Sequence, residues 1–379
     1  MFPLLGGLIK YGKIQLTIMK ILFLNTNIGY GGASKMIVWV ANQCATEGND
    51  VTIVTYRDTA VNQFISKKIK HVHFNLECNG GLGDGLLSTV RFLRRYIKNE
   101  AFDVAVAFLP PSQIRLSLAC LGLKTKLLYS QRGDPFQKGK TLKMKIVEKI
   151  NNWLFSFADF YVFQTIGAQQ YYSKAIQDRS VVIPNPINRI ERTVERKGNI
   201  ERKIVCVARL DLYQKRQDIL IEAFIKIEKR YPDVVLELYG DGSKFDEEKL
   251  HELSSNHSQI KFMGKMNESD IVDHIQNAAI GVLSSDFEGI PNALLEYMSL
   301  GIPSISTDCS PGGAAMLIKN NINGLLVDRG NATELAEAMS FMLDNVEKAE
   351  KMGIEGTKVV EDYSENRIQT QWISALNKM

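Results

Sequence analysis

Two glutamates lie eight positions apart around the start of a predicted helix. Glu288 precedes the helix, and Glu296 lies within it. The segment opens after an apolar run that ends at Ser284; Pro291 suits the first turn of a helix that runs to Ser299, and Gly301 would cap it. Free N–H groups at a helix start can hold phosphate oxygens, and nearby carboxylates can accept hydrogen bonds from hydroxyls. Glu296 could instead be a solvated charge, but its apolar neighbours indicate a mostly buried helix, where an unpaired glutamate is rare. The pattern favours a ligand that carries phosphate and hydroxyl groups.

Two basic residues form a second candidate cluster. Arg209 follows a predicted strand at 204–208, and Lys215 lies six positions later. A guanidinium and an ammonium at the end of a strand are typical of a clamp for a diphosphate. Alone they would be read as surface charges, but their position in the same domain as the two glutamates favours a site.

A glycine-rich turn follows the first clean strand pattern, at 20–25. Gly31 and Gly32 would let a ligand approach the backbone at a helix N-terminus. The third glycine of a dinucleotide fingerprint would fall at Ser34, so the turn does not predict NAD binding. A tight strand-to-helix turn is the structural interpretation.

Rigid elements must position these residues, and the sequence predicts them. Strand-length apolar runs alternate with helical patterns, which indicates an α/β fold of two successive doubly wound parallel-sheet domains in a chain of 379 residues. Pro184 and Pro186 end the first pattern. We expect an N-terminal extension or upstream mis-start at 1–18, a first domain at 19–186, a linker at 187–202, a second domain at 203–362, and a helix at 363–379 that crosses back. Such sheets bind ligands at the carboxyl ends of their strands, so the active site should lie in the cleft between the domains.

Composition excludes several classes of protein. Hydrophobic residues make up 45% and charged residues 23%, which is typical of a globular chain and excludes disorder. The five cysteines have no metal-ligand spacing, and we expect reduced, mostly buried thiols in a cytosolic protein. No apolar run approaches the roughly 18 residues that span a bilayer. Charge is divided unevenly, because residues 1–190 hold 24 basic and 11 acidic residues whereas the remainder hold 22 and 31.

Taken together, the motifs resemble the GT-B retaining glycosyltransferases of family 4, also called group 1, over nearly the whole chain from Met19. Any one motif is weak, but their order is specific. The resemblance rests on the following segments: Tyr30-Gly-Gly-Ala33, Ile183-Pro-Asn-Pro186, the Arg209 and Lys215 pair, Gly240-Asp-Gly242, Glu288-Gly-Ile-Pro-Asn292 with Glu296, and Asn323-Gly-Leu-Leu-Val327.

The resemblance implies two Rossmann-like domains that face a central cleft, and it implies roles for single residues. Arg209 and Lys215 would hold the diphosphate of a nucleotide sugar and stabilise the leaving group, while Glu288 would bind the donor sugar and Glu296 the ribose. Other implied donor contacts are Gly31, Gly32, Asp241, Gly264 and Lys265, the last two beside the base, and the N–H groups around Gly289, Ile290 and Asn292. The implied reaction is a substrate-assisted front-face displacement that needs no metal and no cofactor beyond its co-substrate, since the basic clamp replaces the metal.

The sequence departs from the family pattern at two places. Many relatives carry a histidine after the strand at 126–130, where this chain has Arg132 and Asp134, which we take as acceptor-side candidates. An acidic residue that usually follows Gly312-Gly313 is absent near Met316, which suggests a different contact there.

The first half is the acceptor-binding half in this fold, and it is strongly basic. Basic residues cluster on two predicted helices: Arg91, Arg94, Arg95 and Lys98, then Lys138, Lys140, Lys143, Lys145 and Lys149. A basic amphipathic helix suits an anionic membrane surface, although a solvated helix face is the plain alternative. We found no nucleic-acid recognition motif.

These features predict a hexosyltransferase-type glycosyltransferase with a UDP-sugar as the default donor. Its acceptor would be lipid-linked or a growing glycan in surface polysaccharide synthesis, such as lipopolysaccharide or capsule, and the enzyme would be cytoplasmic, peripheral on the inner face of the plasma membrane. A GT-B-like sugar-nucleotide epimerase is the alternative. A degenerate carbohydrate-binding subunit is disfavoured by the intact Arg209, Lys215, Glu288 and Glu296.

Overall fold

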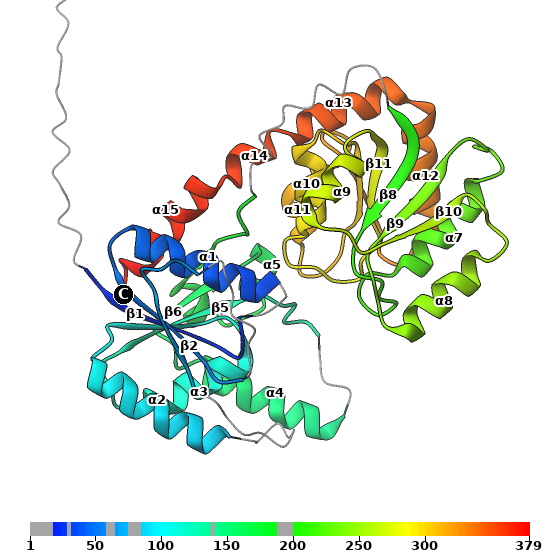
Figure 1. The fold of residues 1–379 in the computed structure, drawn as a ribbon. Helices are drawn as coiled ribbons and strands as arrows, with labels where there is room; N and C mark the ends of the chain where they lie inside the picture. The colour runs from blue at the N-terminus through cyan, green and yellow to red at the C-terminus, as the bar shows by residue number, and fades with distance from the viewer. Residues whose placement is uncertain (1–17, 29–31, 58–64, 75–84, 138–140, 188–199) are drawn as a thin grey trace, which may run out of the picture.

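The chain folds into two parallel β-sheets, each covered by helices on both faces (Figure 1). The computed structural model describes residues 18–28, 32–57, 65–74, 85–137, 141–187 and 200–379. Gly31, most of the predicted linker and nearly all of the predicted N-terminal extension lie outside these residues. The α/β fold of two Rossmann-like domains, predicted from the sequence, is confirmed.

The first domain contains a seven-stranded sheet in the order β3-β2-β1-β4-β5-β6-β7. Its strands are β1 (Lys20–Asn25), β2 (Asp50–Thr55), β3 (Lys70–His73), β4 (Val104–Ala107), β5 (Lys126–Gln131), β6 (Phe160–Phe163) and β7 (Ser180–Val182). Its helices are α1 (Gly32–Thr46), α2 (Leu86–Glu100), α3 (Pro110–Ala119), α4 (Leu142–Phe155), α5 (Ile166–Gln170) and α6 (Lys174–Gln177). Strand β4 and the middle of β1 are apolar because helices bury both faces of the sheet.

The second domain contains a six-stranded sheet in the order β10-β9-β8-β11-β12-β13. Its strands are β8 (Glu201–Val207), β9 (Val235–Tyr239), β10 (Ile260–Gly264), β11 (Ala278–Leu283), β12 (Ser304–Thr307) and β13 (Leu325–Val327). Its helices are α7 (Gln217–Ile227), α8 (Lys244–Ser254), α9 (Glu268–Ile275), α10 (Asn292–Ser299), α11 (Gly313–Leu317), α12 (Ala332–Asp344), α13 (Val346–Gly356) and α14 (Val359–Asp362).

Each sheet has one position where the strand order reverses direction. In the first sheet it lies between β1 and β4, and in the second between β8 and β11. Helices leave such a pair toward opposite faces, which opens a crevice beyond the carboxyl ends of the two strands. The loops after β1, β4, β8 and β11 are therefore the places where the fold can bind a ligand.

The last helix, α15 (Glu365–Leu376), returns to the first domain and lies beside α1 (Figure 1). Its Ile368 and Trp372 are fully buried in the core of the first domain, where the Trp372 ring stacks on Phe108 at 5.5 Å between centroids. Ile187 forms an isolated parallel bridge with Ser364, so the outgoing and returning segments run side by side.

Three of the differences between the structure and the sequence-based elements concern β3, α3 and α10. Strand β3 was not predicted, because it is a half-polar edge strand rather than an apolar run. Helix α3 was not predicted either, because its first two residues, Pro110 and Pro111, look like a turn although proline fits the first helical turn. Helix α10 begins at Asn292, with the extended Pro291 as its N-cap rather than in its first turn.

Candidate active site

The two loops at the switch point of the second sheet are joined by backbone and side-chain hydrogen bonds. One loop follows β8 and the other follows β11. The Asp286 N–H donates to the Gln214 carbonyl at 2.8 Å, and the Ser284 hydroxyl donates to the Lys215 carbonyl at 2.9 Å. Residues 70 positions apart thus form one rigid rim at the carboxyl edge of the sheet.

An ion pair between Lys215 and Glu288 occupies this rim. The ammonium of Lys215 contacts one carboxylate oxygen of Glu288, and their side chains are 20% and 10% exposed. The Ser285 hydroxyl donates to the same carboxylate oxygen at 2.8 Å, and the Gln214 amide reaches the other at 3.5 Å. Because the carboxylate is nearly buried, these partners compensate for its lost hydration and fix its orientation.

Arg209 lies at the exposed end of the same loop. Its side chain is 62% exposed and pairs with Asp211. Burial opposes ionisation of Asp211, but N–H groups of Gln214 and Tyr213 and the Arg209 guanidinium outweigh it, so the pKa of Asp211 is lowered. The Lys215 N–H donates to the Asp211 carbonyl at 2.9 Å, so Asp211 organises the loop that carries both predicted cations.

The start of α10 brings the predicted Glu288–Asn292 segment beside this pair. Ile290 is buried, whereas Asn292 is exposed at the first helical position. Glu296 is half-buried one turn further along, on the same side of the helix as Asn292. A side chain at Gly289 would place its Cβ 2.1 Å from the Gln164 amide oxygen, so a larger residue here would displace the end of the Gln164 side chain.

Three other predicted donor residues meet two strands away. Asp241 follows β9, Gly264 is the last residue of β10, and Lys265 follows it. The Lys265 ammonium lies 3.6 Å from the Asp241 carboxylate, and the Gly240 N–H donates to the Gly264 carbonyl at 2.9 Å. This exposed cluster lies on the same carboxyl edge as Lys215 and Glu288.

In the first domain, Gly32 is the exposed first residue of α1, and a Cβ there would meet no atom within 4 Å. Arg132 and Asp134 follow β5, next to the switch-point strand β4. The Arg132 guanidinium lies over the rings of Phe108 and Trp372, 4.9 and 5.3 Å from their centroids. Asp134 accepts a hydrogen bond from the Phe136 N–H at 2.9 Å.

Asp134 also lines a cavity of about 650 Å³ between the domains. The first domain contributes Phe136, Gln137 and Gly167 to its wall, and the second contributes Phe287, the residues 308–312 and Arg329. Because Phe287 precedes Glu288 directly, the cavity opens beside the ion pair. The cavity therefore leaves room for a ligand next to the candidate donor site.

Sequence reasoning missed the contact that closes this cleft. Gln164 and Thr165 follow β6, and the Thr165 hydroxyl donates to the Pro311 carbonyl of the other domain at 2.9 Å. A Cβ on Gly167 would lie 2.3 Å from the same carbonyl oxygen. These polar residues directly after a buried apolar strand carry the same signal that selected Arg209, so the strand-end rule could have found them.

Charged partners around the ion pair were missed as well. Arg216 donates to Asp286 at 2.8 Å and to Asp218 at 2.9 Å, which ties the two loops together a second time. Arg216 stands in the left-handed region at φ 52, where a non-glycine residue is uncommon, and these hydrogen bonds hold it there. No local sequence signal pairs residues 70 positions apart.

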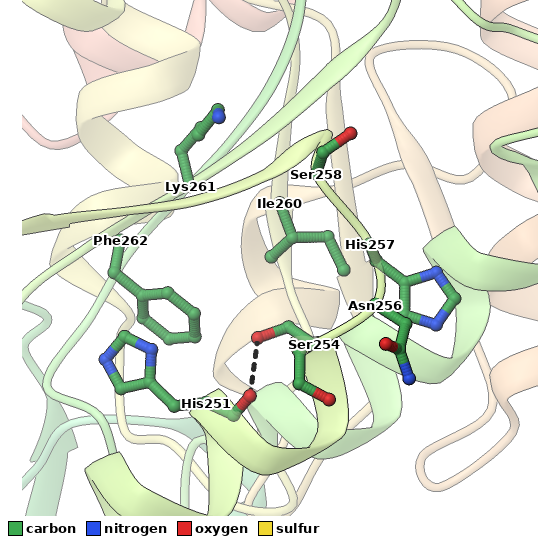
Figure 2. Close-up of a pocket in the computed structure, with 9 residues that line it drawn as sticks. His251, Ser254, Asn256, His257, Ser258, Ile260, Lys261 and Phe262 are labelled. Atoms are coloured by element: carbon green, nitrogen blue, oxygen red, sulfur yellow. Dashed lines mark hydrogen bonds between the residues drawn. The ribbon is translucent and has the colours of Figure 1, made fainter.

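A second, smaller pocket of about 410 Å³ lies away from the ion pair, and Figure 2 shows the residues that line it. It is lined by the end of α8 and the start of the edge strand β10, where the His251 ring lies 3.9 Å from that of Phe262. His257 faces outward from this rim and pairs with Glu228. Because the pocket is at the amino end of β10, it is remote from the carboxyl ends that carry Lys215 and Glu288.

Family models match both halves of the chain. The family described as "Glycosyltransferase Family 4" matches residues 30–190, and "Glycosyl transferases group 1" matches residues 188–359. Within the described part of the chain, the helices are all too short or too polar to cross a bilayer.

Curated relatives align over almost the full length. An uncharacterised glycosyltransferase of Haemophilus influenzae is 25% identical over 93% of this chain and 98% of its own. A Campylobacter jejuni enzyme is 23% identical over 94% of this chain and 98% of its own, and its name describes α-1,4-N-acetylgalactosaminyl transfer to an oligosaccharide on undecaprenol diphosphate.

Solved structures share the fold. Anabaena HepE, solved with UDP and with UDP-glucose, superposes with a TM-score of 0.76 in its UDP complex, at 18% identity over 95% of this chain and all of the other. The geometry of the two switch points, the family models and the full-length relatives agree, and the chain is therefore a glycosyltransferase that belongs to the group 1 family with the GT-B fold.

Proposed function

We propose that this glycosyltransferase moves a sugar from a UDP-sugar to a lipid-linked or growing glycan acceptor during surface polysaccharide synthesis. The Lys215–Glu288 pair at the β8/β11 switch point carries the proposal, since a cation for a diphosphate and a carboxylate for hydroxyls stand side by side there. UDP and UDP-glucose complexes of HepE support the donor class, and the undecaprenol-linked substrate in the name of the Campylobacter relative supports the acceptor class.

In this proposal the second domain binds the donor. Lys215 and Arg209 hold the diphosphate, Glu288 accepts hydrogen bonds from sugar hydroxyls, and Glu296 accepts them from the ribose. The N–H groups around Gly289, Ile290 and Asn292 contact the sugar or phosphate. The cluster of Asp241, Gly264 and Lys265 lies beside the base, and Gly32 approaches from the first domain.

The proposed chemistry retains the anomeric configuration. The bond from the anomeric carbon to the diphosphate breaks, the acceptor oxygen bonds to that carbon on the same face, and the acceptor proton passes to the leaving phosphate oxygen. Lys215 and Arg209 stabilise the charge that develops on the diphosphate, as preorganised cations do in a partly buried site. Because these cations take the role of a metal, we expect no metal requirement.

The first domain would bring the acceptor from a membrane. On α4, Val147, Ile150 and Trp153 are 39%, 50% and 62% exposed, and Phe157 just beyond the helix is 42% exposed. They share one side of the helix, and the Trp153 and Phe157 rings meet edge to face. Lys149 is exposed on the same helix. An exposed apolar and aromatic stripe beside positive charge is typical of a helix that lies in a lipid interface.

Helix α2 extends this surface. It lies on the same face of the sheet as α3 and α4 (Figure 1), and its four basic residues, Arg91, Arg94, Arg95 and Lys98, are exposed. Each cation near an anionic membrane contributes about 1 kcal/mol. We therefore propose a peripheral enzyme on the inner face of the plasma membrane.

A panel of nucleotide sugars tests the donor. The bound donor should raise the melting temperature by mass action, and UDP-sugars should outperform GDP- and ADP-sugars. Incubation with donor and a polyprenyl-diphosphate-linked glycan then distinguishes transfer from the epimerase alternative. A glycan lengthened by one sugar supports the proposal, whereas an epimerised nucleotide sugar formed without acceptor overturns it.

A further inference from the structure

Arg132 is a cation in an aromatic environment at the junction of the two domains. Its guanidinium lies over the rings of Phe108 and Trp372, which come from the end of β4 and from α15. Its Nη1 donates to the Asn185 side-chain oxygen at 3.2 Å. Among the described residues, its Nε and Nη2 atoms are shielded from solvent and have no hydrogen-bond partner. This burial lowers the pKa of Arg132 to about 9.

Such an arrangement is unfavourable for folding. A buried donor without a partner loses its hydration and gains nothing in exchange, and this loss is larger for a charged group. An unbranched apolar side chain of similar length could pack over the two stacked rings without that loss. The contacts with the two rings and with Asn185 leave the Nε and Nη2 donors uncompensated, so Arg132 is a costly residue for the stability of the first domain.

Its hydrogen bond leads to the second domain. Asn185 stands between Pro184 and Pro186, whose rings restrict the backbone on either side. The Asn185 amide nitrogen in turn donates to the Asn292 side-chain oxygen at 3.0 Å. Asn292 is the first residue of α10, directly after the loop that carries Glu288. Two side-chain hydrogen bonds thus connect β5 of one domain with the proposed donor helix of the other.

We infer that Arg132 is a positioning residue that aligns the two domains for sugar transfer through Asn185 and Asn292, at the expense of stability. The inference rests on the proposed donor site at the start of α10. Transfer requires the acceptor oxygen and the anomeric carbon to come within reacting distance, and the angle between the domains sets that distance. A misplacement of about 1 Å can lower a rate by about 100-fold.

The test compares Arg132→Met with Asn185→Ala in the full-length protein. For both we expect kcat for transfer to fall about tenfold or more, with the donor KM within about twofold, because donor contacts within the second domain remain. Arg132→Met should melt at the same or a higher temperature. The double variant should be no slower than the slower single variant, because both changes interrupt one path.

Arg179→Met is the matched control. Arg179 also lies over an aromatic ring, that of Tyr161, and donates to a carbonyl, but it is remote from the domain junction. It should keep kcat near that of the unchanged protein.

Three results would overturn the inference: an unchanged kcat in Asn185→Ala, a fall in melting temperature that accompanies the loss of kcat in Arg132→Met, or additive losses in the double variant. Asn185→Ala keeps the test decisive if Arg132→Met does not fold. If Lys215→Ala also kept full turnover, the proposed donor site itself would be wrong, which is a different outcome.

Discussion

The two switch points of this enzyme differ in the side chains that surround their cations. At the second, the three cations of the β8 loop each contact a carboxylate: Arg209 with Asp211, Lys215 with Glu288, and Arg216 with Asp286 and Asp218. Beside the first, on the loop after β5, Arg132 forms no ion pair with any described residue and lies over two aromatic rings that stack on each other. The ion pairs of the second domain hold its charged side chains in place before a charged ligand binds. The Arg132 contacts instead connect the two domains.

Breaking the charge pair should give the largest effect. Lys215→Ala and Glu288→Ala should each lower transfer by about 100-fold or more, because each removes a group aimed at developing charge or at the donor sugar. Initial rates with saturating donor measure the effect. Lys226→Ala removes half of an exposed ion pair on α7 and should keep the normal rate.

Folding of the charge-pair variants needs a separate control, since either change removes the oppositely charged partner of a largely buried side chain. Circular dichroism should be unchanged and the melting transition should remain cooperative. Near-normal turnover in either variant would contradict the site assignment.

Blocking the contact between the domains should have an intermediate effect. Gly167→Ala would place a Cβ 2.3 Å from the Pro311 carbonyl oxygen, which is backbone and cannot move away cheaply. We expect kcat to fall about tenfold as the cleft is displaced. Gly133→Ala is the control, because a Cβ there meets nothing within 4 Å. Equal activity in the two variants would show that this contact does not set the cleft.

Changing the lipid-facing surface should have a smaller effect, confined to the first domain. The double variant Trp153→Ser and Phe157→Ser should reduce binding to anionic liposomes about tenfold, since each side chain loses apolar area that a bilayer would bury. Phe245→Ser, in an equally exposed position on α8 of the second domain, should leave binding unchanged. Unchanged binding in the double variant would remove the membrane proposal but not the donor site.

Chelation should have the smallest effect. If Arg209 and Lys215 take the role of a metal at the diphosphate, EDTA should leave the initial rate within about twofold. A loss of activity that returns with added Mg²⁺ would mean that the charged loops of the second domain hold a cation rather than replace one.

The same contrast explains which features the sequence could predict. The strand ends that carry Arg209, Asp241 and Glu288 follow from apolar runs and the rule that ligands bind there. The ion pair between Lys215 and Glu288 could not be predicted, because 73 positions separate the two residues. The sequence instead grouped Lys215 with Arg209, as two cations of one diphosphate clamp. The aromatic environment of Arg132 could not be predicted from the sequence either, because Trp372 belongs to α15, far from Arg132 in the chain.

The interdomain contacts show the same limit. Nothing in the local pattern around Gly167 indicates that Pro311 of the other domain lies against it. Periodicity reports which side of an element is buried, but two nearly rigid domains can meet in many ways. The few polar contacts that fix the arrangement of the two domains do not produce a periodic pattern in the sequence.

The return of α15 has a consequence for biosynthesis. Ile368, Trp372, Ala375 and Leu376 complete the core of the first domain, yet they are synthesised only after the whole second domain. Domains generally fold during synthesis in the order in which they emerge. The apolar face of the first domain therefore stays exposed until the second domain has been synthesised, and a nascent chain stalled before Trp372 should be a better chaperone substrate than a chain that includes α15.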